Sequence, residues 1–189
     1  AYRETPEVDY RDYRSAVRNS FPLHEMWGRE PNAQIASDKE ELEEQLEGVL
    51  ESLLDAATAR QIDLGLEVEP AHIQGQTWLL RELLVNLADN AIKYTPPGGR
   101  VTLRSGLRAA PDALVHHPFL EVEDDGPGIP VAEMARVLER FYRVPGTAIE
   151  GNGLGLAIAD EIARVHRSHL QMAPGAEGRG LRIWLVLAA

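Results

Sequence analysis

A long run of leucine and alanine residues at helical spacing, from about residue 76 to 94, ends at the string Pro96-Pro97-Gly98-Gly99. Apolar side chains recur every three or four residues along this run, which predicts an amphipathic helix with one buried face. Two prolines and two glycines in succession stop a helix. The predicted buried face consists of Leu79, Leu80, Leu83, Leu84, Leu87, Ala88 and Ala91.

The rest of the chain mixes strand and helix patterns without a regular alternation. Residues from Ser37 onward predict a helix, with Ser37 as its N-cap and Glu40 completing a capping box. His116 and His117 are expected in a loop. An irregular order of elements favours an α+β sandwich, in which helices cover one sheet. Strands are predicted near 62–68, 100–107, 118–124, 168–173 and 180–187, a short helix near 131–140, and a helix near 153–166.

Charge and composition exclude several classes of partner. Lys and Arg number 19 against 30 Asp and Glu, a net charge of −11, which argues against nucleic acid or an anionic membrane surface as a partner. The chain has no cysteine and no apolar run long enough to span a membrane. We divide it into residues 1–37, an extension of unknown role, and a domain at 38–189.

The polar side chains of the leucine-rich helix form the first candidate site. Asn86, Asn90 and Lys93 recur at i, i+4 and i+7, so they share a face. Amide oxygens suit a hard divalent cation that bridges to phosphates, and a lysine one turn further on can reach a phosphate oxygen. The alternative interpretation of these residues is a solvated polar face.

A second candidate site follows a predicted strand. The strand ends at Asp124, and the chain then enters the turn Gly126-Pro127-Gly128-Ile129-Pro130. A buried carboxylate at this point can accept a hydrogen bond from an exocyclic amine, and glycines allow close approach of a flat ligand. The alternative is an ordinary Asp-Gly turn.

The third candidate site is Gly151-Asn152-Gly153-Leu154-Gly155-Leu156, followed by an amphipathic helix. Glycines at the start of a helix expose main-chain N–H groups at its positive end, which favours anion binding. This string does not follow a predicted strand, as a dinucleotide-binding fingerprint would, which argues against that interpretation.

In this order and spacing, the three strings resemble the N, G1 and G2 boxes of the histidine-kinase ATP-binding domain, a relative of the gyrase, Hsp90-type and MutL ATPases. Arg140-Phe141-Tyr142-Arg143 is similar to the F box of that family, and Gly178-Arg179-Gly180 to a final glycine box. The resemblance covers about residues 40–187. It implies the Bergerat fold, a two-layer sandwich with a mixed, mostly antiparallel sheet covered on one face by about three helices.

The resemblance also implies roles for individual residues in a site for ATP and Mg²⁺. Asn90 would coordinate Mg²⁺ with Asn86 beside it, while Lys93 would contact phosphate and Tyr94 would lie along the nucleotide. Asp124 would bind the adenine amine. The other nucleotide contacts would be Gly126, Gly128, Ile129, Tyr142, Asn152, Gly153, Leu154, Gly155 and Leu156.

Residues from about 143 to 152 would form the lid over the nucleotide. Residues 144–152 contain no Lys or Arg, although many lids of the family present a basic group to the γ-phosphate. Arg143 is the nearest candidate, and together with Asn90 and Lys93 it forms the implied catalytic set. Leu181 stands where the family often has Thr.

The resemblance implies the catalytic domain of a two-component sensor histidine kinase, in the cytoplasmic part of an inner-membrane protein. Such a domain transfers phosphate to a histidine on the dimerisation hairpin of its own kinase, and through it indirectly to a response regulator. We do not find that hairpin in the sequence: His24 lies too close to Asn90 and is flanked by Pro22 and Gly28. The chain is therefore expected not to phosphorylate itself.

Two other functions are considered. A self-contained ATPase or anti-sigma serine kinase of the same superfamily carries a general-base Glu four residues before the metal-binding Asn. Asn86 occupies that position here and cannot accept a proton, and Glu82 is a turn further away. A degenerate nucleotide-binding module is the other alternative, which the departures in the lid favour and the complete boxes oppose.

Overall fold

The computed structural model describes residues 34–36, 39–109, 116–146, 149 and 151–188. All of them belong to the part of the chain that spans Asn32–Ala189. The predicted extension, residues 1–37, lies outside the described residues except for Gln34–Ala36, which form strand β1. The predicted N-cap at Ser37 is also outside them.

The main sheet of the described residues has five strands in the order β2-β4-β5-β7-β6. Strand β2 is parallel to β4, and every other neighbouring pair is antiparallel. This confirms the predicted mixed and mostly antiparallel sheet. The strands are β2 Asp63–Val68, β4 Arg100–Ala109, β5 His116–Asp124, β6 Gln171–Pro174 and β7 Leu181–Val186.

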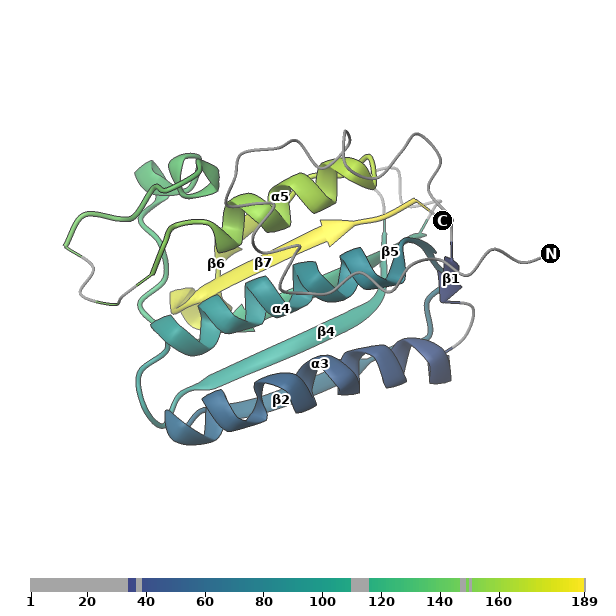
Figure 1. Cartoon of the computed structure of the whole chain (residues 1–189), viewed down its shortest axis with the longest axis horizontal. Helices are drawn as coiled ribbons and strands as arrows, with labels where there is room; N and C mark the ends of the chain where they lie inside the picture. Colours follow the sequence, from purple (N-terminus) through teal and green to yellow (C-terminus); the bar gives the residue numbers. More distant parts are fainter. Residues whose placement is uncertain (1–33, 37–38, 110–115, 147–148, 150, 189) are drawn as a thin grey trace. The chain divides into compact units, whose positions relative to one another are not determined.

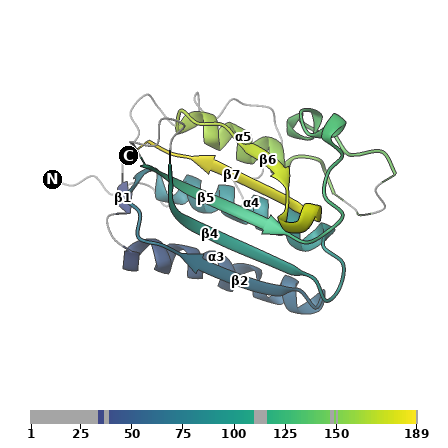
Figure 2. The same cartoon turned by 180° about the vertical axis from the view of Figure 1, so that it is seen from behind.

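Three helices cover one face of this sheet, as the opposite views of Figures 1 and 2 show. They are α3 Lys39–Ala59, α4 Thr77–Tyr94 and α5 Gly155–Val165. Helix α4 lies in the middle, in contact with α3 on one side and α5 on the other. The predicted two-layer sandwich is therefore confirmed, and its central helix is the one that carries the candidate N box.

The core lies between the helices and every second residue of the central strands. Val101 and Leu103 of β4, and Leu120 and Val122 of β5, are buried because alternate side chains of a strand point to the same face. All seven apolar residues predicted for the buried face of α4 are buried. Packing against both neighbouring helices and the sheet therefore holds α4 as a rigid support for its polar residues.

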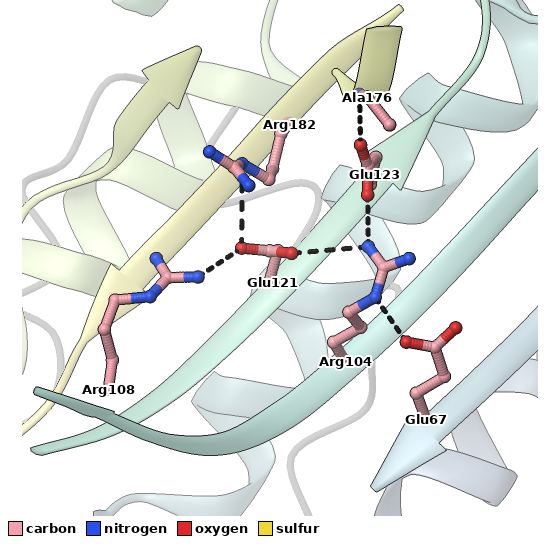
Figure 3. A network of polar contacts seen from close by, with 7 residues as sticks. All are labelled: Glu67, Arg104, Arg108, Glu121, Glu123, Ala176 and Arg182. Carbon is pink, nitrogen blue, oxygen red and sulfur yellow. Dashed lines mark hydrogen bonds and ion pairs between the residues drawn. The ribbon is translucent and has the colours of Figure 1, made fainter. Parts of the chain in front are cut away.

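The other face of the sheet carries a network of charged side chains, shown in Figure 3. Its central residue, Glu121, is buried although no helix covers it, because arginine side chains surround it. Glu121 bonds Arg104 at 3.3 Å and Arg108 at 2.7 Å, and Arg182 lies 4.0 Å away. We name Glu67, Arg104, Arg108, Glu121, Glu123 and Arg182 the outer-face network.

Two small features differ from the sequence-based predictions. Strand β1 pairs with β3 Ile73–Gly75 in a separate two-stranded sheet that the pattern did not predict. The short helix expected near 131–140 is instead two 3-10 turns, η1 Val131–Glu133 and η2 Arg136–Leu138. Val137 is the buried residue of these turns, so little packing offsets the cost of nucleating an α-helix there.

The loop prediction for His116 and His117 is wrong. These residues begin β5 and pair with Ala109 and Arg108 of β4. The main-chain ladder therefore begins before the first apolar residue of β5, whereas the sequence pattern places the start of a strand at its apolar residues. Among the described residues, no helix has the length and apolar composition needed to cross a membrane.

Candidate nucleotide-binding site

The polar face of α4 begins with a pair of buried side chains. Asn86 is 8% exposed, and its Nδ2 donates to both the main-chain oxygen and Oε1 of Glu82, each at 2.8 Å. This pairing orients the amide, because its nitrogen faces Glu82 and its oxygen is turned away from that carboxylate. The Glu82 carboxylate is itself held by the pairing and is 4% exposed.

Asn90, one turn further along α4, lies against the start of α5. A methyl group built on Gly155 would stand 2.8 Å from Nδ2 of Asn90 and 3.5 Å from its Oδ1. Any side chain at Gly155 would therefore displace the amide. The structure thus brings together two predicted site residues that are 65 positions apart, and the glycine allows the N-terminal end of α5 to approach α4.

Lys93 is paired within its own helix. Its Nζ lies 2.5 Å from Oδ2 of Asp89, one turn earlier, and 43% of its side chain is exposed. Such an exposed pair is weak, about 0.3–0.5 kcal/mol for an i,i+4 pair. A phosphate group could therefore replace Asp89 as the partner of Lys93 at small cost.

Asp124 ends β5 on the face of the sheet that the helices cover, and it is 9% exposed. One carboxylate oxygen accepts the N–H of Gly126 at 2.9 Å, and the main-chain N–H of Leu181 also donates to the carboxylate. Burial raises the pKa of Asp124 to about 6, against the opposing effect of these two hydrogen bonds. A buried carboxylate with donors behind it remains a strong acceptor for a further N–H from a ligand.

The glycines around Asp124 fit closely against main chain. Gly180 has a φ of +71°, and a Cβ there would lie only 1.7 Å from the main-chain oxygen of Asp124. The oxygen of Gly180 in turn lies 2.7 Å from the position of a Cβ on Gly128. On the other side, a Cβ on Gly126 would be 3.3 Å from the main-chain oxygen of Tyr94, the last residue of α4. The candidate G1 turn therefore sits between the final glycine box and the end of the candidate N box.

The candidate F box and the G2 string are joined through their main chains. Phe141 donates its N–H to the oxygen of Gly153 at 2.8 Å, and its side chain is 64% exposed. The hydroxyl of Tyr142 donates to Glu133, and its ring centroid lies 4.2 Å from the guanidinium carbon of Arg136. The side chain of Tyr142 thus contacts residues of both η1 and η2.

Arg143 donates from Nη2 to the main-chain oxygen of Ile149, so it is bonded within the predicted lid. Residues 147, 148 and 150 of that lid lie outside the described part of the chain. Asn152 is exposed, while Ile129, Leu154 and Leu156 are half-buried.

Two contacts near the site were not predicted. Arg60 donates to the main-chain oxygens of Ile92 and Lys93, and Asp125 accepts the N–H of Arg100 at 2.8 Å. Each of these side chains bonds main-chain atoms, which every residue type offers. A sequence pattern therefore does not indicate which main-chain atoms Arg60 and Asp125 bond.

Comparisons with known proteins show the family to which the chain belongs. A family model described as histidine kinase-, DNA gyrase B- and HSP90-like ATPase matches residues 75–189. The sensor protein kinase PmrB of Pseudomonas aeruginosa is 37% identical over 142 residues, which cover 75% of this chain and 28% of PmrB. The signal transduction histidine-protein kinase/phosphatase MprB of Mycobacterium tuberculosis is 38% identical over 146 residues, which cover 74% of this chain and 28% of MprB.

Solved structures agree with the fold. The mycobacterial sensor histidine kinase MprB matches with a TM-score of 0.66 and 32% identity, over 82% of this chain and 97% of that one. The Acinetobacter baumannii histidine kinase AdeS matches with a TM-score of 0.66 at 21% identity, over 94% of this chain and 75% of that one. The chain belongs to the histidine kinase-, DNA gyrase B- and HSP90-like ATPase family, as an ATP-binding catalytic domain of the sensor histidine kinase type. It spans 28% of the length of the two curated relatives.

Proposed function

We propose that this chain binds ATP together with Mg²⁺ and transfers the γ-phosphate to a histidine on the dimerisation hairpin of its own kinase. The observation that carries the proposal is the contact between Asn90 and Gly155, which sets an amide ligand beside the N-terminal end of a helix. Phosphates bound with a metal would use both, because the amide oxygen would hold the cation and the helix N–H groups would donate hydrogen bonds to the phosphate oxygens.

The other residues have complementary roles. Asp124 accepts a hydrogen bond from the adenine amine, and its burial excludes competing water. Lys93 exchanges its bond to Asp89 for one to a phosphate oxygen. Main-chain N–H groups at Gly153, Leu154 and Gly155 cradle the phosphates, and Arg143 is the basic group nearest to the lid.

The donor set fits Mg²⁺. Mg²⁺ prefers oxygen ligands and keeps several of its waters, so the amide oxygens of Asn90 and Asn86 would be suitable protein ligands for it. Asn86 supports this assignment, because Glu82 holds its nitrogen and leaves its oxygen turned away. Bound there, the cation neutralises charge on the phosphates.

The pairing of Asn86 with Glu82 also bears on the alternative of a self-contained ATPase. An enzyme of that class needs a carboxylate that activates the attacking water as general base. Glu82 is buried and accepts the amide of Asn86 at 2.8 Å, an arrangement that suits a structural role. The attacking group is therefore an imidazole supplied by the hairpin, which is a competent nucleophile near neutral pH.

Incubation of the chain with γ-labelled ATP, with and without the separately produced hairpin, tests the proposal. We expect very slow phosphate release and no labelling of the chain alone, and labelling of the hairpin histidine in the mixture. Positioning and electrostatic stabilisation of the γ-phosphate are sufficient for that transfer. Rapid phosphate release by the chain alone, or an acid-labile label on His24, would assign the protein to the ATPase or self-contained kinase class.

Replacing Asn90 with alanine should weaken ATP binding mainly when Mg²⁺ is present. Loss of a metal-ligating amide is expected to cost about ten- to a hundredfold in affinity, the range seen when metal sites are perturbed. Calorimetric titrations with Mg²⁺ and with EDTA measure the difference. Asp124→Asn is the matched control, because an adenine contact should be lost equally in both buffers. An equal loss in EDTA for Asn90→Ala would contradict the metal assignment.

We propose further that the chain is the cytoplasmic catalytic part of an inner-membrane sensor kinase and that a response regulator is its indirect partner. Its net charge of −11 supports the absence of nucleic-acid and membrane-surface contacts by this part of the protein.

A further inference from the structure

Arg60, directly after the end of α3, bonds two main-chain oxygens at the end of α4. Its Nε donates to the oxygen of Ile92 at 2.9 Å and its Nη2 donates to the oxygen of Lys93 at 2.7 Å. The arginine is half-buried, and 32 residues separate it from the nearer partner. One planar guanidinium thus joins the C-terminal ends of two neighbouring helices.

The two oxygens belong to the last turn of α4. Main-chain oxygens in a last helical turn lack partners within the helix, and together they form its negative end. A guanidinium satisfies both oxygens at once and places a positive charge at that end. Its fixed fork geometry defines the position of the turn more sharply than a single point charge would.

Main-chain hydrogen bonds extend this contact into the loop that follows α4. The N–H of Gly98 donates to the oxygen of Gln61, and the N–H of Asp63 donates to the oxygen of Gly99, both at 2.9 Å. Gln61 adopts a φ of +57°, a conformation that a non-glycine side chain rarely takes without support from its surroundings. The turn formed by residues 60–63 is therefore built around the end of α4 and its loop.

From this evidence we infer that Arg60 is a positioning residue of the nucleotide site. It fixes the turn of α4 that carries Lys93 and adjoins Asn90. It thereby sets the position of these side chains along the axis of α4 relative to the start of α5. The inference rests on the proposed function, because it assigns Lys93 and Asn90 to the phosphates and the metal.

Arg60→Met in the full chain removes both hydrogen bonds while keeping an apolar stem of similar length. We expect its dissociation constant for Mg-ATP to rise about tenfold, the size of a lost bond to a charged group. Adenosine lacks the phosphates and metal assigned to Lys93 and Asn90, so its binding should stay within about twofold of wild type. Arg60→Lys keeps the charge and should give an intermediate loss for Mg-ATP.

Arg81 offers a matched control. Its Nη2 donates to the main-chain oxygen of Gly48 at 3.2 Å, so it also links α4 to α3, but near the other end of α4. Arg81→Met should bind Mg-ATP like wild type. Displacement of a fluorescent ATP analogue measures the Mg-ATP constants, ligand-observed NMR measures adenosine, and circular dichroism checks folding.

The outcomes separate the possible failures. Unchanged Mg-ATP affinity in Arg60→Met, or an equal loss for adenosine, would overturn the inference while the proposed function stands. An equal loss in Arg81→Met would also overturn it, since any link between the helices would then suffice. Absence of Mg-ATP binding by the wild-type chain would instead overturn the proposed function. If Arg60→Met does not fold, the Mg-ATP affinity of Arg60→Lys tests the inference instead. Wild-type affinity in Arg60→Lys would show that the two hydrogen bonds of the guanidinium are not needed to position the site.

Discussion

Asp124→Asn should make the ligand-free chain more stable and at the same time weaken ATP binding about ten- to a hundredfold. Asparagine can still accept the N–H of Gly126 through its oxygen, so the turn is preserved. Its amide nitrogen then faces the adenine amine, and two donors cannot bond each other. The buried negative charge, which opposes folding, is removed.

The stability effect has a defined pH dependence. Burial raises the pKa of Asp124 from 3.8 to about 6, so the folded chain holds a proton that the unfolded chain releases. Protonated Asp124 therefore favours the folded state. This contribution to the free energy of unfolding is complete below pH 3.8 and is lost as pH rises through about 6. Above that pH the ionised group costs the fold up to about 3 kcal/mol. Urea denaturation of the wild type and Asp124→Asn at pH 5 and pH 8 measures this difference.

The advantage of Asp124→Asn should therefore be larger at pH 8 than at pH 5. Asp125→Asn is the matched control, because the Asp125 side chain is exposed and accepts the N–H of Arg100 in an exposed hydrogen bond. An advantage that does not grow with pH, or one shared by Asp125→Asn, would show that desolvation of Asp124 is not its cause. Unchanged ATP affinity in Asp124→Asn would show that Asp124 only stabilises the turn at Gly126.

Gly180→Ala should be among the most damaging single-methyl changes in the site. The φ of +71° costs any other residue about 1–3 kcal/mol, and the added carbon would overlap the main-chain oxygen of Asp124 at 1.7 Å. Relief of that overlap requires β7 and the end of β5 to separate, which adds about 1–3 kcal/mol of strain. Asp124 moves with its own main chain, so Mg-ATP binding should also be lost.

Gly178→Ala separates the two causes. Gly178 has nearly the same φ, +73°, but a Cβ there meets nothing within 4 Å. The free energy of unfolding of this variant should fall only by the conformational cost of the positive φ. The variant should bind Mg-ATP like wild type. Urea denaturation and ATP-analogue displacement on both variants are the measurements. Equal losses of stability and binding in the two would refute the proposed close approach at Gly180.

The sequence was most informative where a pattern was long or a chemistry was specific. The apolar period of α4 runs over its whole length and ends at four breakers, so the seven apolar residues expected on its buried face are all buried, although Ile92, which is also buried, was not among them. Asp124 follows a strand pattern and precedes glycines, and it is buried as that position suggested. The contact of Asn90 with Gly155 depends on packing between distant elements, which the family resemblance implied and the residue pattern alone did not.

Other features left no usable pattern. Strands β1 and β3 have three residues each, too few to display a period. The hydroxyl of Tyr142 donates to Glu133, and nothing in the sequence spacing identifies that partner. Arg60 was missed because its partners are main-chain oxygens, whose positions follow from the fold and not from residue identity.

The outer-face network has a consequence for how β5 is aligned. Glu121 and Glu123 stand opposite Arg104 and Thr102 of β4, while Asp124 stands opposite Val101. A slip of one residue along β4 would turn both glutamates into the apolar layer beneath the helices and carry Asp124 out of the site. Arginines that hold the glutamates outside penalise that slip. The side of the sheet opposite the proposed nucleotide site thereby selects which carboxylate lies in that site.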